Sequence, residues 1–213
     1  MESIQTYLPG ILLAYGAFLV GIASPGPNVM AVMGTSMSIG RPQGLALAMG
    51  IAVGSLTWAL LTALGLSAIL TQYAYTLFII KLFGGAYLLY LAYKAFKSAA
   101  SAHDIEATAL HNPSTTAVSY AIRGYTIQMT NPKAALSWIA IMSLGLTTDA
   151  PVWVAAIIVL GTFVLSVILH GLYALAFSSA PMVRLYARAR RGIQFILGTF
   201  FTIVGLRLLM SRS

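Results

Sequence analysis

Residues 151–177 read PVWVAAIIVLGTFVLSVILHGLYALAF, and no charged residue lies between Asp149 and Arg184. A helix needs about 20 predominantly apolar residues to cross the hydrocarbon layer of a bilayer. This stretch is both long enough and apolar enough to do so. It therefore predicts a membrane-spanning α-helix.

The same pattern extends over the rest of the chain. No charged residue lies between Glu2 and Arg41 or between Arg41 and Lys81. The 213 residues are 59% hydrophobic and 8% charged, with a mean hydropathy of +0.88, whereas soluble proteins are roughly 25% charged. A soluble fold could not cover so much apolar surface with so few ionic groups. The composition predicts an all-α integral membrane protein.

Gly, Pro and charged residues divide the apolar sequence into six predicted transmembrane helices. Their ranges are roughly 7–32, 43–69, 74–96, 121–146, 151–178 and 192–210. The segment from Ser98 to Ser119 is the one long polar stretch of the sequence. We expect it to be a solvated linker.

Lys and Arg concentrate in alternate loops of this arrangement. The first, third and fifth loops carry Arg41, Lys94, Lys97, Arg123, Arg184, Arg188, Arg190 and Arg191. Because cytoplasmic loops carry an excess of Lys and Arg, the odd-numbered loops are expected in the cytoplasm and both termini outside. Topology also explains the net charge of +8, so no nucleic-acid partner is expected.

The two halves of the chain share their interruptions. Ser24–Asn28 (SPGPN) interrupts the first span, and Thr130–Lys133 (TNPK) interrupts the fourth. This correspondence favours an inverted repeat of three plus three helices within one membrane domain. Residues 1–97 and 121–213 would form the repeats, and residues 98–120 a cytoplasmic linker.

The same interruptions predict that helices 1 and 4 are broken, because proline lacks an amide donor and clashes with the preceding turn. A break creates helix ends inside the membrane. The free amides and positive dipole end of the following half-helix suit an anion such as a carboxylate. The candidate substrate-binding or transport-path residues are Pro25, Gly26, Pro27, Asn28, Lys81, Asn131, Pro132 and Lys133.

Three polar residues within the predicted spans leave alternatives open. Lys133 lies near mid-depth, where a cation is costly; a carboxylate-binding or gating lysine is favoured over one that caps bare carbonyls. Lys81 lies nearer the end of its span, and it either lines the path or extends its charge to the interface. For His170, a packing role is favoured over a proton relay.

The sequence lacks the motifs that an enzyme would need. It contains no Cys, and we find no metal-ligand cluster, nucleophile elbow, paired catalytic carboxylates or phosphate-binding loop. No enzymatic activity, cofactor or metal is therefore expected. Movement of a solute is the remaining interpretation.

The sequence also resembles a known family. PGPN at 25–28 and NPKAAL at 131–136 are similar to the two signature segments of the LysE/RhtB translocators. The tracts Gly44–Gly65 and Lys81–Lys94, the latter beginning KLFGGAYLLYL, resemble the same family. The resemblance implies a bacterial inner-membrane exporter of amino acids or their derivatives, driven by a proton or sodium gradient. It places the residues of the two Pro segments at or near the transport path.

Two features depart from that family's relatives. The predicted spans contain no acidic residue, so a neutral or acidic substrate is favoured over a cationic one. The Pro-Gln-Phe often found after Asn-Pro-Lys in RhtB-like members is missing, and Ser143–Asp149 occupies that region. The expected partners are the lipid bilayer, an amino-acid-like substrate and a coupling ion.

Other interpretations remain open at this point. Gly50 and Gly54 allow a close helix contact, either within the chain or in a homodimer. The alternatives to an amino-acid exporter are a transporter of another small solute or ion, and a membrane scaffold or enzyme component that transports nothing.

Overall fold

A computed structural model describes residues 4–24, 26–72, 74–100, 116–147 and 150–210. These residues form eight α-helices and no strand, as the all-α prediction requires. The helices are α1 (Ile4–Ala23), α2 (Pro27–Ser38), α3 (Arg41–Gln72), α4 (Ala74–Ala100), α5 (Ala117–Thr130), α6 (Pro132–Gly145), α7 (Val152–Ala176) and α8 (Ala180–Met210).

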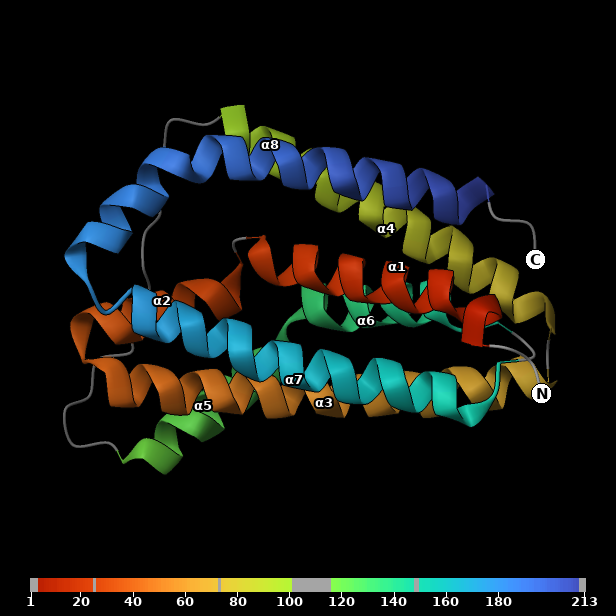
Figure 1. Ribbon diagram of the computed structural model, residues 1–213, viewed down its shortest axis with the longest axis horizontal. Helices are drawn as coiled ribbons and strands as arrows, with labels where there is room; N and C mark the ends of the chain where they lie inside the picture. The colour runs from red at the N-terminus through yellow and green to blue at the C-terminus, as the bar shows by residue number, and fades with distance from the viewer. Residues whose placement is uncertain (1–3, 25, 73, 101–115, 148–149, 211–213) are drawn as a thin grey trace.

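Four of these helices contain segments long and apolar enough to cross a membrane. The segments are Ile4–Ala23, Arg41–Gly65, Val152–Ala176 and Arg184–Met210. The long helices run roughly side by side along the longest axis of the molecule (Figure 1). The protein is therefore a helical bundle whose length suits a bilayer.

Both predicted breaks are confirmed. The first predicted span is divided into α1, which ends at Ala23, and α2, which begins at Pro27. The fourth is divided into α5, which ends at Thr130, and α6, which begins at Pro132. Both second halves have proline in their first turn, where the missing amide would have no helical partner.

Other predicted boundaries were wrong. The sixth predicted helix begins at Ala180 rather than near residue 192, because the arginine-rich segment before it is rich in helix-forming Ala, Leu and Arg. Similarly, α4 continues to Ala100 and α5 begins at Ala117, so both enter the predicted linker; residues 101–115 lie outside the described part. Hydropathy marks only the part of a helix that lies in hydrocarbon, which explains these errors.

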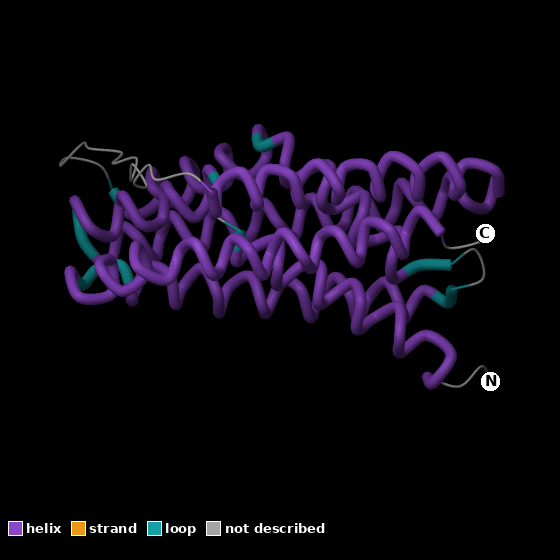
Figure 2. Tube along the Cα trace, turned by 90° about the horizontal axis from the view of Figure 1, so that it is seen from above, coloured by secondary structure: helices purple, strands orange, loops and turns teal. Residues whose placement is uncertain are grey.

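The helices are arranged in three layers (Figure 1). The helices α4 and α8 pack together on one side, and α3 packs with α5 and α7 on the other. The pair α1 and α6 lies between them, with Gly10 of α1 close to the carbonyl oxygens of Leu144 and Gly145. The start of α1 and the end of α8 lie at the same end of the bundle, as Figure 2 also shows. The two broken helices thus contribute to the centre of the molecule.

Glycines allow α3 and α5 to touch backbone to backbone. A Cβ atom at Gly50 would meet the carbonyl oxygen of Ala121, and one at Gly124 would meet that of Leu47. A Cβ atom at Gly54 would lie 2.9 Å from the side chain of Gln128. The close contact predicted for Gly50 and Gly54 is therefore made within the chain.

We predict that Gly124→Ala lowers the free energy of unfolding in detergent micelles by about 1–3 kcal/mol, the usual cost of overpacking. Gly192→Ala is the matched control, since nothing lies within 4 Å of an added Cβ at that position of α8. Alanine is favoured over glycine in a helix by about 1 kcal/mol, so the control is expected to be neutral or stabilised. Equal stability of Gly124→Ala and the wild type would contradict the backbone contact.

Candidate functional site

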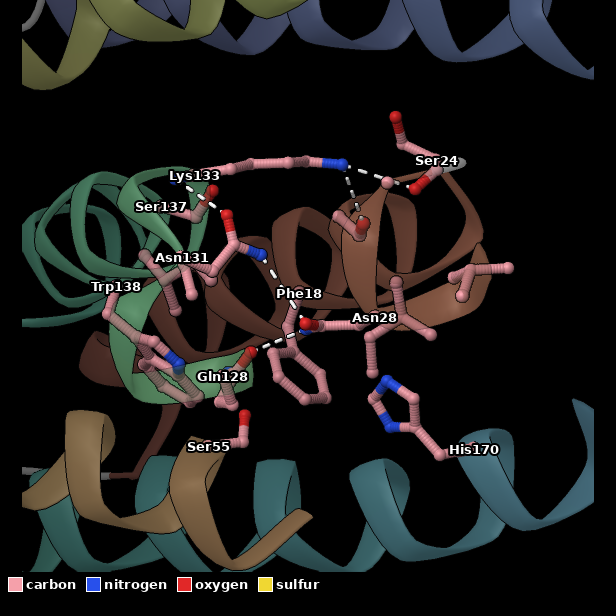
Figure 3. Close-up of a pocket in the computed structure, with 16 residues that line it drawn as sticks. Phe18, Ser24, Asn28, Ser55, Gln128, Asn131, Lys133, Ser137, Trp138 and His170 are labelled. Carbon is pink, nitrogen blue, oxygen red and sulfur yellow. Dashed lines mark hydrogen bonds between the residues drawn. The ribbon is translucent and has the colours of Figure 1, made fainter. Parts of the chain in front are cut away.

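The two helix breaks meet at the centre of the bundle, where three amide side chains connect them (Figure 3). Nδ2 of Asn28, in the first turn of α2, donates to Oε1 of Gln128 near the end of α5. Nδ2 of Asn131 in turn donates to Oδ1 of Asn28 across 3.4 Å. These bonds join residues about one hundred positions apart, so they fix one break relative to the other.

The two half-helices that begin at the breaks differ in how their first amides are satisfied. In α6 the N-cap Asn131 accepts the Lys133 amide on its side-chain oxygen at 3.0 Å, and its carbonyl accepts the amide of Ala134 at 2.9 Å. In α2 the N-cap is Gly26, and no side chain caps the helix. The N-terminus of α2 is therefore the one of the two that a ligand can cap.

Lys133 extends from α6 to the other break. Its ammonium donates to the carbonyl oxygen of Ser24 at 3.1 Å and lies 3.5 Å from that of Gly21. These carbonyls belong to the C-terminal end of α1, where the helix dipole is negative and the last carbonyls lack helical partners. In this conformation the lysine caps carbonyl oxygens that lack helical partners. The sequence analysis considered this role but favoured carboxylate binding or gating.

A similar hydrogen bond satisfies a backbone carbonyl at the C-terminal end of α5, at the other break. The indole Nε1 of Trp58, on α3, donates to the backbone carbonyl of Gln128 at 3.2 Å. Gln128 is only 4% exposed. Both C-terminal helix ends at the breaks thus have donors supplied by a different helix, as a low-dielectric environment requires.

A cavity of about 60 Å³ lies between these elements. The predicted site residues that line it are Gly26, Asn28, Asn131 and Lys133, and Figure 3 shows the last three around one space. Pro27 and Pro132 begin the two half-helices. Pro25 lies outside the described residues, and the structure describes Lys81 only as part of helix α4.

The structure adds residues that the sequence analysis missed. Gln128, Ser55, Ser137 and Trp138 also line the cavity. Gln128 carried a signal, since it is an uncharged polar residue one helical turn before the Asn131 break. Ser55 carried none, because its helix packs against the breaks only in the tertiary fold. His170, for which packing was favoured, is buried and lines the same cavity.

The described residues that line the site include a lysine but no carboxylate. All four acidic residues of the chain, Glu2, Asp104, Glu106 and Asp149, lie outside the described residues. Within the described part, no group of His, Cys, Asp or Glu that could hold a metal ion is present. Polar groups that converge at broken helices inside an apolar bundle are typical of the binding sites of membrane transporters.

Comparison with protein families extends this assignment. Residues 19–212 match the LysE type translocator family. The chain belongs to this family, so it is a membrane transporter and not an enzyme. The resemblance carried by the two Pro segments is confirmed.

Relatives of similar length are found in bacteria. The chain is 28% identical to the uncharacterized membrane protein YahN of Escherichia coli K12 over 203 residues, which cover 95% of this chain and 90% of that protein. It is 29% identical to the threonine efflux protein of Salmonella typhi, covering 91% and 94% of the two chains. It is 27% identical to the leucine efflux protein of Klebsiella pneumoniae, covering 61% of each. No solved structure matches the chain.

The link between the breaks can be measured by a double-mutant cycle. We predict a coupling free energy of about 0.6 kcal/mol, and at most about 1.7 kcal/mol, between Asn28→Ala and Gln128→Ala, as for other hydrogen bonds between membrane helices. Unfolding in mixed micelles gives the four stabilities. Asn28→Ala combined with Ser143→Ala is the control, because the Ser143 hydroxyl donates to its own helix at Ile139. Additivity of the Asn28 and Gln128 changes would argue against the bridge.

Proposed function

We propose that this protein is a secondary transporter that exports amino acids or their derivatives across the bacterial cytoplasmic membrane, driven by an ion gradient. Its family membership supports transport, and two relatives carry the names threonine efflux protein and leucine efflux protein. The observation that carries the proposal is the meeting of a partly buried lysine with an uncapped helix N-terminus at the two breaks.

This arrangement suits a carboxylate for two reasons. A helix N-terminus binds anions through its free amides and dipole, and the ammonium of Lys133 lies close to Gly26, 3.4 Å from the position of a Cβ on that residue. When a carboxylate arrives, Lys133 can exchange the Ser24 carbonyl for a charged acceptor, which is the stronger hydrogen-bond partner. Substrate binding would then release the end of α1, coupling occupancy of the site to movement of the broken helix.

The cavity described is too small for an amino acid. A cavity of about 60 Å³ holds only a few waters, at roughly 10–15 Å³ each on this measure. An amino acid can enter only if the helices around the cavity separate. Alternating access would then be movement of the half-helices around a site that stays near the bilayer midplane.

A neutral amino acid is the favoured substrate. A cationic side chain would lie near Lys133 with no carboxylate among the described lining residues to pair with it. Threonine and leucine, which the names of the two relatives specify, are both neutral. An acidic amino acid would bring two anionic groups to a cavity in which Lys133 is the one described cationic lining residue. Acidic amino acids are therefore less favoured as substrates than neutral ones.

For the architecture, we propose six transmembrane helices in an inverted repeat, with residues 1–97 and 121–213 as the halves and 98–120 as a cytoplasmic linker. The breaks at equivalent points support this. So does the packing of equivalent helices against each other, α3 against α7 and α4 against α8. The distribution of Lys and Arg supports cytoplasmic odd-numbered loops and external termini.

We predict that Lys133→Met lowers the transport rate by about 10- to 100-fold, which corresponds to the loss of a hydrogen bond to a charged group. Asn131→Ala should lower the transport rate by less. Counterflow of radiolabelled threonine and leucine in proteoliposomes measures this. Lys97→Met is the matched control, because that lysine is exposed in the last turn of α4. If Lys133→Met and Asn131→Ala transport like the wild type at equal expression, the site assignment fails. Absence of wild-type counterflow across a broad amino-acid panel would favour another solute.

Topology can be tested because the natural chain has no cysteine. We predict that a membrane-impermeant maleimide labels Thr147→Cys, in the connection between α6 and α7, in intact cells. It should label Ala187→Cys, on the exposed early part of α8, only after permeabilisation. Both positions are exposed, so access and not burial decides the result. The reverse pattern would show that the orientation is inverted.

A further inference from the structure

His170 is a buried polar residue for which the carboxylate site described above has no use. It lies on α7, is 3% exposed, and is surrounded in sequence by the apolar run VLSVILHGLYALA. Imidazole is costly to bury without partners. Its position in the cavity wall, across from the helix breaks, calls for a functional explanation.

One edge of the His170 ring is fixed by its own helix. Nδ1 lies 3.0 Å from the carbonyl oxygen of Ser166 and 3.2 Å from the Ser166 hydroxyl. Because a carbonyl oxygen only accepts, the tautomer that forms this bond has its proton on Nδ1. A neutral imidazole with its proton on Nδ1 has a lone pair on Nε2, which makes Nε2 a hydrogen-bond acceptor.

The other ring nitrogen of His170, Nε2, is the atom that can bind a ligand. In Figure 3 the side chain projects from α7 toward Asn28, on the opposite side of the cavity from Lys133. No hydrogen bond from a described residue reaches Nε2. The cavity therefore has a positive charge at one side, from Lys133 beside Gly26, and a nitrogen acceptor at the other, from His170.

The charged and titratable neighbours of His170 are few among the described residues. Lys133, on α6, is the one other ionisable lining residue of the cavity. The helices α1 and α2 carry no charged residue, while α3 contributes Arg41, which donates to Ser178 beyond the end of α7. Tyr173 follows on α7 itself, where it stacks on Phe177. No carboxylate from these helices competes with Nε2 for a cationic group.

We infer that Nε2 of His170 binds the ammonium group of the exported amino acid, and that the same nitrogen binds the proton that returns in exchange. This inference rests on the function proposed above, since the zwitterion's carboxylate would lie toward Lys133 and α2. An Nε2 that carries a proton donates instead of accepting, and its positive charge repels an ammonium. Substrate and proton therefore exclude each other at one atom.

This exclusion couples the two fluxes when the carrier changes conformation only with the amino acid or the proton bound. Neutral His170 binds the zwitterion on the cytoplasmic side and releases it outside. The imidazole then takes a proton from external water on Nε2 and becomes imidazolium. It loses that proton to the cytoplasm after the protonated carrier, without amino acid, has returned. One net-neutral amino acid leaves and one proton enters, so atoms and charge balance. Reciprocal exclusion of two ligands at a site is the thermodynamic basis of such exchange.

Two variants separate the parts of the inference. In His170→Gln an amide oxygen can replace the acceptor but cannot hold a proton. We expect counterflow at equal pH to be retained, because the acceptor is replaced, and acceleration by an inward proton gradient to disappear. In His170→Phe neither group can bind, so counterflow of the amino acid should fall to the rate of its analogue that lacks the amino group.

The experiment uses the full chain in proteoliposomes, with and without an imposed pH or sodium gradient. Thr162→Val is the control, because that buried hydroxyl donates to carbonyls of its own helix on the same face of α7. Monodisperse purification and thermal unfolding confirm that each variant folds. A normal gradient response in His170→Gln, or export driven by sodium alone, would overturn the proton assignment. Undiminished amino-acid counterflow in His170→Phe would overturn the ammonium assignment, whereas absence of counterflow in the wild type would instead refute the proposed function.

Discussion

Inside a bilayer, a backbone carbonyl without a donor costs several kcal/mol, because no water is available to satisfy it. The break after α1 creates such carbonyls, and the ammonium of Lys133 satisfies those of Ser24 and Gly21. A lysine at this depth is itself costly unless it has partners. Each group therefore removes the other's penalty, and the bond ties the start of α6 to the end of α1. The geometry of the cavity depends on this one interaction.

The two breaks are similar in sequence but differ in how they are completed. Asn131 closes the start of α6 with its own side chain and carbonyl, whereas Gly26 leaves the start of α2 without a side-chain cap. A site built from one closed and one open helix end has a direction, with a single preferred place for an anion. The open end and the lysine lie on the same cavity, which is why we propose a carboxylate as the ligand.

Close packing holds the remaining polar groups in position. The glycines of α3 and α5 bring the two backbones together, and Trp58 and Gln128 meet just beyond that contact. Phe18 and Trp138, whose ring centroids are 5.4 Å apart, cover the cavity between α1 and α6. Because membrane helices gain little from apolar burial against each other, such small-residue contacts and buried hydrogen bonds carry much of the specificity of the arrangement.

The sequence by itself predicted the apolar runs, the two break points and the concentration of Lys and Arg in alternate loops. Each of these features follows from the chemistry of a short segment. Pro25–Asn28 and Asn131–Lys133 interrupt their helices whatever the rest of the chain does. The length of α8 was not readable in this way, since helix propensity continues where hydropathy ends. The partner of the Lys133 ammonium, and the inclusion of Gln128 and His170 in the cavity, were decided only by tertiary structure. These contacts join residues far apart in sequence, 109 positions for Lys133 and Ser24, and only the packing of whole helices brings them together.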